Sequence, residues 1–201
     1  MHNYIKNQIQ ESVNVKQLVL KDNKIMTTIK SITLQIIEAY QKGNKTIIAG
    51  NGGSAADAQH LSAEFVGKYN FDRPALPSIA LTTNTSVLTA IGNDYGYDNI
   101  FSRQIEANGV SGDVFIGIST SGNSKNVIEA FKECKKKGII TVGLTGKKGG
   151  EFENYCSFCL KVPSIETPRI QEIHILIGHI ICSMTEESIF GKNSVDEKKY
   201  K

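Results

Sequence analysis

The chain has 201 residues, of which 40% are hydrophobic, and this size and composition are typical of one soluble globular domain. They exclude a disordered, collagen-like or multi-span membrane protein. The formal net charge of +3 comes from the ends, because lysines outnumber acids in residues 1–30 and 192–201, while residues 31–191 carry a net −2. This distribution disfavours a basic nucleic-acid-binding face.

The N-terminal residues MHNYIKNQIQESVN lack the apolar core of a signal peptide. No apolar run approaches the ~20 residues that span a bilayer. We therefore expect a cytoplasmic protein without a membrane segment and with reduced cysteines. Cys156 and Cys159 form a CxxC pair without a second pair to complete a zinc site, which favours structural thiols over a redox or metal role.

Helical and strand patterns alternate along the chain. Helices over about 5–20 and 25–42 come first, as an N-terminal helical hairpin. Short apolar runs predict strands over 46–50, 78–83, 114–120, 140–146 and 158–163. Between and after them, the apolar spacing predicts helices over 53–68, 85–92, 98–107, 124–137 and 169–190.

Strands that are apolar on both faces and alternate with helices predict a buried parallel sheet. The expected fold is α/β, a three-layer αβα sandwich around a doubly wound, flavodoxin-like parallel sheet of about five strands. We expect a single domain with N-terminal helices over about 5–42, an αβα core over about 46–190 and a flexible tail over 191–201.

The loop over 119–124 follows a predicted strand and opens a helix, and four of its six residues are hydroxylic: Ser119, Thr120, Ser121 and Ser124. Hydroxyls and backbone N–H groups at the positive end of a helix dipole suit a phosphate monoester. The alternative is a Ser/Thr-rich turn with a helix cap, but a cap needs only one such residue. We favour phosphate binding.

The segment from Gly50 to Ala55 reads GNGGSA and matches a permissive dinucleotide fingerprint. The acidic partner expected about 20 residues on, at the end of the second strand, is missing, because that strand ends in Thr82 and Thr83. We therefore expect Gly52 and Gly53 to allow a small ligand to approach the backbone, with Asn51 and Ser54 offering polar contacts.

His60 and Glu64 stand four residues apart and share one helix face. On the last helix, Gln171 and His179 stand eight apart, so one flank can present both. Such donors could hold a divalent transition metal, with zinc the first expectation. From spacing alone, a pair such as His60/Glu64 more often belongs to a solvated helix surface, and spacing also leaves His174 as a competitor of His179.

Two further polar features remain open from the residues alone. Asn93 and Asp94 lie in a predicted polar break between helices, where turn chemistry explains them. Arg169 opens the last helix and could bind an anion or pair with Glu172.

Five blocks, in order, carry a resemblance: GNGGSAADAQH over 50–60, Glu64, AIGND over 90–94, GISTSG over 117–122 and RIQEIHILIGH over 169–179. Together they resemble the phosphoheptose isomerases of the sugar isomerase (SIS) domain superfamily, over about residues 5–190. The resemblance implies a homotetramer with active sites at subunit contacts, and one zinc ion per subunit held by His60, Glu64, Gln171 and His179. It implies substrate contacts from Asn51, Gly52, Gly53, Glu64, Asn93, Asp94, Ser119, Thr120, Ser121, Ser124 and Gln171, and it leaves His174 in a supporting role.

The implied reaction converts sedoheptulose 7-phosphate into D-glycero-D-manno-heptose 7-phosphate through an enediol, the first step towards heptose precursors of surface glycans such as lipopolysaccharide or capsule. Such a reaction needs a base and an acid, and we assign Glu64 as the base and His179 as the acid. One alternative is a non-catalytic SIS-domain tetramer that binds the replication initiator DnaA. Another is an isomerase for a different sugar phosphate.

Overall fold

The computed structural model describes residues 1–191, so all but the first residue of the predicted tail lies outside the described residues. The described chain forms one five-stranded parallel sheet in the order β2-β1-β3-β4-β5. The strands are β1 (Thr46–Gly50), β2 (Ser78–Ala80), β3 (Val114–Ile118), β4 (Ile140–Thr145) and β5 (Phe158–Lys161). This is the order of flavodoxin-like doubly wound sheets, and it confirms the predicted fold class.

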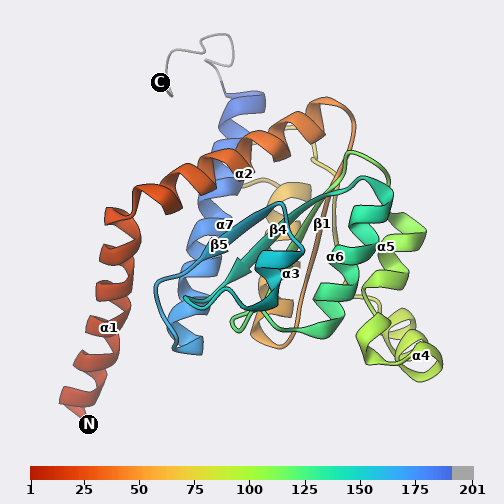
Figure 1. Cartoon of the computed structure of the whole chain (residues 1–201). Helices are drawn as coiled ribbons and strands as arrows, with labels where there is room; N and C mark the ends of the chain where they lie inside the picture. The colour runs from red at the N-terminus through yellow and green to blue at the C-terminus, as the bar shows by residue number, and fades with distance from the viewer. Residues whose placement is uncertain (192–201) are drawn as a thin grey trace.

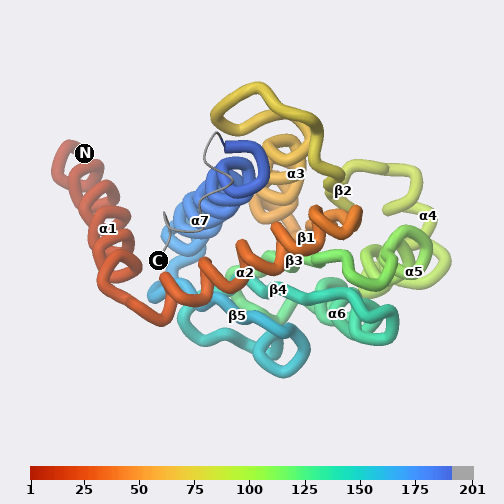
Figure 2. The backbone as a smooth tube through the Cα atoms, turned by 90° about the horizontal axis from the view of Figure 1, so that it is seen from above, coloured from red at the N-terminus to blue at the C-terminus, as the bar shows by residue number. Residues whose placement is uncertain are grey.

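Helices cover both faces of the sheet (Figure 2). On one face lie α2 (Asn23–Gln41), α3 (Gly53–Val66) and α7 (Thr167–Phe190), and on the other lie α5 (Ser102–Asn108) and α6 (Lys125–Lys137). Successive residues of a strand point to opposite faces, so Ile48 packs under α2, α3 and α7, whereas Ile47 and Ala49 pack under α5 and α6. Burial on both faces is why the strands read as continuous apolar runs.

Some element bounds differ from the predicted ones. The helix predicted over 85–92 is α4 (Thr85–Tyr95) and extends three residues further. The helix predicted over 98–107 is divided into the short 3-10 helix η1 (Tyr97–Asn99) and α5. A second 3-10 helix, η2 (Gly150–Asn154), precedes β5.

The predicted pair of N-terminal helices is present as α1 (His2–Lys21) and α2. The single residue Asp22 joins them and caps α2, accepting hydrogen bonds from the backbone N–H groups of Lys24 and Ile25. Figure 1 shows that the two helices diverge and that α1 projects from the body of the molecule. The pair is therefore an open bend in which α2 alone covers the sheet.

We expect no segment that could span a membrane, and α7 is the helix of residues 1–191 that bears on this expectation. By length and composition alone this helix is apolar enough to do so, with a mean hydropathy of 1.2 over 18 residues. Ile173, Ile177 and Ile181 are buried against the sheet and neighbouring helices. The core helix of a globular domain passes the same test, and α7 occupies that position (Figure 1).

Candidate active site

The carboxyl ends of β1 and β3 lie side by side, at the point where the strand order reverses. Ligands bind at this position in doubly wound sheets. The side chains of Asn51, after β1, and Asn126, on α6, exchange two hydrogen bonds of 3.0 and 2.9 Å. Tyr97 donates a third bond, of 3.1 Å, to Asn51. Sequence reasoning missed Asn126 and Tyr97, and the available signal was an amide at the second residue of the helix that follows the Ser-rich loop.

The hydroxyls of the 119–124 loop converge. Ser119 Oγ lies 2.8 Å from Ser124 Oγ and 3.3 Å from Ser121 Oγ. Ser124 is the N-cap of α6, yet among residues 1–191 its hydroxyl makes no capping hydrogen bond. The first amides of α6 are therefore left to bind an anion or water, which favours a phosphate cradle over a simple capped turn.

A second loop supports this cradle from behind. Gly122 has a φ of +69°, and a Cβ there would collide with the carbonyl of Gly149. The N–H of Gly146 donates to the Thr120 carbonyl at 3.1 Å. A cavity of about 300 Å³ lies between the two loops, lined by Thr120, Ser121, Asn123, Lys147 and Lys148 among others. The cradle therefore has open space beside it and lysines at its rim.

Gly52 and Gly53, at the start of α3, have different roles. Gly52 has a φ of +57°, and no atom within residues 1–191 lies within 4 Å of a Cβ built there. Gly53 packs against α7, since a Cβ there would lie 2.6 Å from Gln171 Nε2. Gly52 thus leaves room for a ligand, as expected, and Gly53 lets two helices meet.

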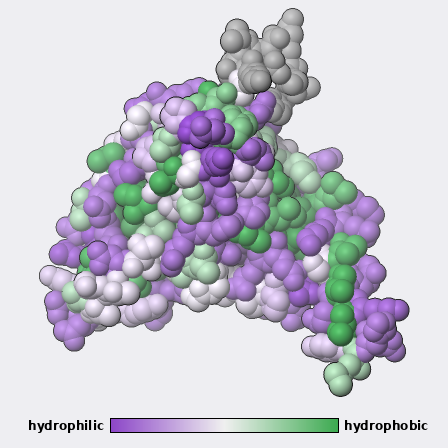
Figure 3. All heavy atoms as spheres, turned by 180° about the vertical axis from the view of Figure 1, so that it is seen from behind, coloured by the Kyte–Doolittle hydropathy of each residue, from purple (hydrophilic) through white to green (hydrophobic). Residues whose placement is uncertain are grey.

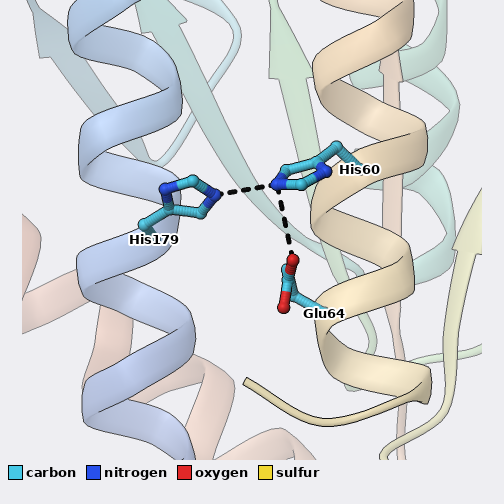
Figure 4. A group of neighbouring side chains, drawn as sticks. All are labelled: His60, Glu64 and His179. Carbon is cyan, nitrogen blue, oxygen red and sulfur yellow. Dashed lines mark hydrogen bonds and ion pairs between the residues drawn. The ribbon is translucent and has the colours of Figure 1, made fainter. Parts of the chain in front are cut away.

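Three potential metal ligands converge between α3 and α7 (Figure 4). Nε2 of His60 lies 2.8 Å from Nε2 of His179 and 3.4 Å from Oε1 of Glu64. One donor atom from each of the three residues lies within 4.8 Å of the others. The third donor, brought in by a separate helix, favours a built site over a solvated surface pair. Two imidazoles and a carboxylate are a donor set that suits zinc.

The fourth predicted ligand lies apart from this trio in the described chain. The side chain of Gln171 rests against Gly53. Gln171 precedes His179 by eight residues, about 12 Å along a helix axis. The predicted four-residue ligand set is therefore not assembled around one point in this structure.

His174 lies outside the trio as well. It is fully buried, and its Nε2 lies 3.2 Å from the carbonyl oxygen of Thr145. Burial lowers the pKa of His174 to about 4, and the hydrogen bond to Thr145 opposes this only partly. Burial thus separates it from His179, where spacing could not.

Asn93 and Asp94 do not occupy a break between helices, as predicted, but the last turn of α4. Both are exposed, and Asn93 donates a hydrogen bond of 2.8 Å to Asp94. Within one chain, α4 lies at the edge of the molecule, and the strands of the sheet lie between it and α7 (Figure 2). The fold therefore does not bring these two residues to the trio.

The two remaining sequence alternatives concern Arg169 and the CxxC pair. Arg169 pairs with Glu172 at 2.7 Å, one of its two predicted partners. Cys156 and Cys159 are free and half-buried, and the Cys156 thiol donates to the carbonyl of Phe152 at 3.0 Å. The hydrogen bond with Cys159 and burial raise the pKa of Cys156, whereas the same hydrogen bond lowers the pKa of Cys159, so only Cys156 has the raised pKa of an inert thiol.

Comparison with known proteins agrees with this fold. The SIS domain family model matches residues 11–146. A phosphoheptose isomerase of Aneurinibacillus thermoaerophilus is 61% identical over 98% of this chain and all of its own length. One of Campylobacter jejuni is 60% identical over 96% of each chain. The structure of a phosphoheptose isomerase from Neisseria gonorrhoeae superposes with a TM-score of 0.87 at 41% identity, covering 92% of this chain and 98% of the other. The chain belongs to the phosphoheptose isomerase family of SIS-domain proteins.

Proposed function

We propose that this protein isomerises sedoheptulose 7-phosphate to D-glycero-D-manno-heptose 7-phosphate. The observation that carries the proposal is the approach of Glu64 and His179 from two helices, which pairs a base with an acid. The names of the relatives support the substrate. A non-catalytic scaffold has no need of a base, an acid and metal ligands in one place.

The cradle and the trio suit the two ends of this substrate. The cradle lies at the carboxyl end of β3. His60 lies seven residues into α3 from Gly53, about 10 Å along the helix axis. An open-chain heptose carries its phosphate at the end opposite its carbonyl. Hydroxyls of Ser119, Ser121 and Ser124 hold the phosphate, and this fixes the position of the reacting carbons.

Isomerisation moves one proton between neighbouring carbons. Glu64 removes the proton from C1, and His179 donates a proton to the carbonyl oxygen at C2, which yields an enediol. Return of a proton to C2 and loss of the proton on O1 then give the aldehyde. One donor atom of Glu64 and one of His179 lie within 4.8 Å of each other, so both residues can act on the same two carbons.

We propose zinc as the cofactor, one ion per subunit, held by His60, Glu64 and His179. Gln171, the fourth ligand that the resemblance implies, rests against Gly53 in one chain, so we propose that it completes the set across a subunit contact. The donor set of the first three residues supports this choice. When bound, zinc supplies Lewis-acid polarisation of the substrate carbonyl. The other proposed substrate contacts are Asn51, Gly52, Gly53, Asn93, Asp94 and Thr120.

We also propose a cytoplasmic homotetramer with active sites at subunit contacts. Exposed Asn93 and Asp94, remote from the trio in one chain, support such a contact. So does α4, none of whose residues is fully buried in the described chain, although Leu88 and Ile91 pack against the core. The product then serves as a precursor for surface glycans.

The reaction is tested by incubating the purified protein with sedoheptulose 7-phosphate, and with hexulose phosphates in parallel, and identifying products by NMR. Glu64→Gln and His179→Gln should each lower kcat by about 10²–10⁴-fold, the usual contribution of a general acid or base. Exposed Glu11→Gln and His2→Gln are the matched controls. Near-wild-type turnover by folded Glu64→Gln and His179→Gln proteins would refute the assigned roles. Tight DnaA binding without turnover would favour the scaffold alternative.

Metal removal tests the cofactor separately. Chelator-treated protein should lose turnover and regain it with added zinc, because three ligands remain in place to bind the ion again. Elemental analysis before and after treatment gives the metal content. Full activity in protein that contains no metal would remove zinc from the proposal.

A further inference from the structure

The segment that follows α3 is anchored to α7 by a buried ion pair. Arg73 Nε lies 3.0 Å from Glu186 Oε1, and the two side chains are only 2% and 1% exposed. Glu186 also accepts backbone hydrogen bonds from Tyr69 at 2.9 Å and Asn70 at 2.6 Å. We call this arrangement the Arg73–Glu186 clamp.

The guanidinium of Arg73 reaches the other helix of the trio. Its two terminal nitrogens donate to the carbonyl of Glu64 at 2.8 Å and to that of Phe65 at 2.7 Å. These carbonyls belong to the last turn of α3, where backbone acceptors lack partners within the helix. The Arg73 side chain thus links the end of α3 to α7, and it does so at Glu64, the proposed base.

The same face of α7 presents the clamp and the proposed acid. His179, Ser183 and Glu186 stand at positions i, i+4 and i+7, which share a helix face. Asn70 Nδ2 donates to Ser183 Oγ at 3.0 Å. The ring of Tyr69 lies 5.6 Å from that of His179, centroid to centroid, and the ring of His60 lies 5.1 Å from it. The anchored segment thus places an aromatic ring against His179.

Glu186 is charged in this environment. Burial opposes ionisation, but hydrogen bonds from Tyr69, Asn70 and Arg73 outweigh it, so the pKa of Glu186 lies below its ordinary value. A buried ion pair by itself is weak evidence for stability, because well-packed apolar residues often serve as well. The guanidinium of Arg73, however, donates both to Glu186 on α7 and to two carbonyls on α3. These directed hydrogen bonds fix the relative position of the two helices, which apolar packing does not.

We propose that the Arg73–Glu186 clamp positions the active site by fixing α3 to α7 and holding Tyr69 against His179, so that Glu64 and His179 keep their mutual geometry. The inference rests on the proposed function for its kinetic consequence. Arg73, Glu186 and Tyr69 are positioning residues, since they act through Glu64 and His179.

Glu186→Gln tests the clamp, because it removes the charge at nearly constant shape. The matched control is Asp113→Asn, which weakens another pair with a buried acid: Lys45 Nζ lies 2.7 Å from Asp113, whose side chain is 0% exposed. Asp113 also accepts two backbone N–H groups, but it lies just before the central strand β3 and its hydrogen-bond partners belong to neither α3 nor α7. Both changes disturb a buried carboxylate, but only one lies beside the trio.

The measurements are kcat and KM for sedoheptulose 7-phosphate at a temperature well below both melting points, and zinc affinity by competition with a chromogenic chelator. In Glu186→Gln we expect zinc affinity and kcat to fall about tenfold or more, as for residues that orient metal ligands, with little change in KM. Asp113→Asn should lower the melting temperature alone. Wild-type kcat and zinc affinity in folded Glu186→Gln would overturn the proposal.

A second pair of variants covers the case in which Glu186→Gln does not fold. Tyr69→Leu removes the half-buried ring without leaving a buried charge unpaired, and should lower kcat and zinc affinity. Tyr69→Phe should restore both, since the ring makes the contact. Wild-type values in Tyr69→Leu would overturn the proposal. If the wild-type protein binds zinc but does not turn over the substrate, the proposed function fails, while the affinities still decide the clamp.

Discussion

Burial gives His174 and His179, five residues apart on one helix, different chemistry. His179 is half-exposed and meets His60 from another helix, whereas His174 is buried beneath the end of β4. Nε2 of His174 faces a carbonyl oxygen and must donate to it, and Nδ1 has no partner among residues 1–191. A second proton on this ring would therefore be buried without an acceptor, which is why its pKa falls.

The neutral state of His174 makes stability depend on pH. The folded protein keeps this imidazole neutral down to about pH 4, whereas in the unfolded chain it binds a proton near pH ~6.5. The unfolded state holds more protons between these values, so stability falls as pH falls through this window. Urea unfolding at pH 7 and pH 5 should show a loss of about 2 kcal/mol from this group.

His174→Gln should lack this contribution, because an amide can donate to the Thr145 carbonyl without titrating. His2→Gln, at an exposed histidine, should keep the full loss. Equal losses between pH 7 and pH 5 in wild type and His174→Gln would show that His174 does not carry the effect.

The N-cap residues of α6 and α2 use their side chains differently. Asp22 accepts two backbone N–H groups at the start of α2. Ser124 turns its hydroxyl towards Ser119, and the amides of α6 stay open. A helix end that is left uncapped by a residue able to cap it is suited to an external anion.

Substituting the cradle should therefore affect binding more than stability. Ser119→Ala and Ser124→Ala should each raise KM for the sugar phosphate by about 10- to 100-fold, because a hydrogen bond to a charged group contributes about 1.5–3 kcal/mol. Asp22→Ala is the matched control and should cost about 1 kcal/mol of stability with an unchanged KM. Unchanged KM in both serine variants would place the phosphate elsewhere.

In the whole molecule, a single chain exposes apolar surface on α1 that is not covered by the rest of the described chain. Helix α1 projects from the body (Figure 1) and carries a column of apolar side chains along its length (Figure 3). Ile5 and Ile9, one turn apart, are 55% and 60% exposed. Contiguous exposed apolar surface of this kind marks an interaction site, which supports the proposed tetramer.

Charges on this column should disrupt assembly. Ile5→Asp/Ile9→Asp should yield smaller species in light scattering coupled to size-exclusion chromatography, because burying carboxylates in an apolar contact is unfavourable. Asn3→Asp/Asn7→Asp adds the same two charges on the opposite face of α1 and should leave the mass unchanged. A wild-type mass in the isoleucine variant would exclude this column from the interface.

Local sequence patterns were enough to predict the fold class and the local features of the site. Strands buried on both faces are apolar throughout, and the Ser-rich loop and the His60/Glu64 pair are legible because their residues are neighbours on the chain. Spacing also restricted the partner on α7 to a few positions. These features depend on short-range periodicity, which the sequence displays directly.

Long-range packing, in contrast, sets which residues meet. Packing buries His174 and leaves His179 beside His60. It places Gln171 against Gly53, and it places Asn93 and Asp94 in a helix away from the trio. It also paired Asn51 with Asn126, and Arg73 with Glu186. Each of these contacts joins residues whose separation in the sequence carries no periodic signal, so it depends on how whole helices pack against the sheet.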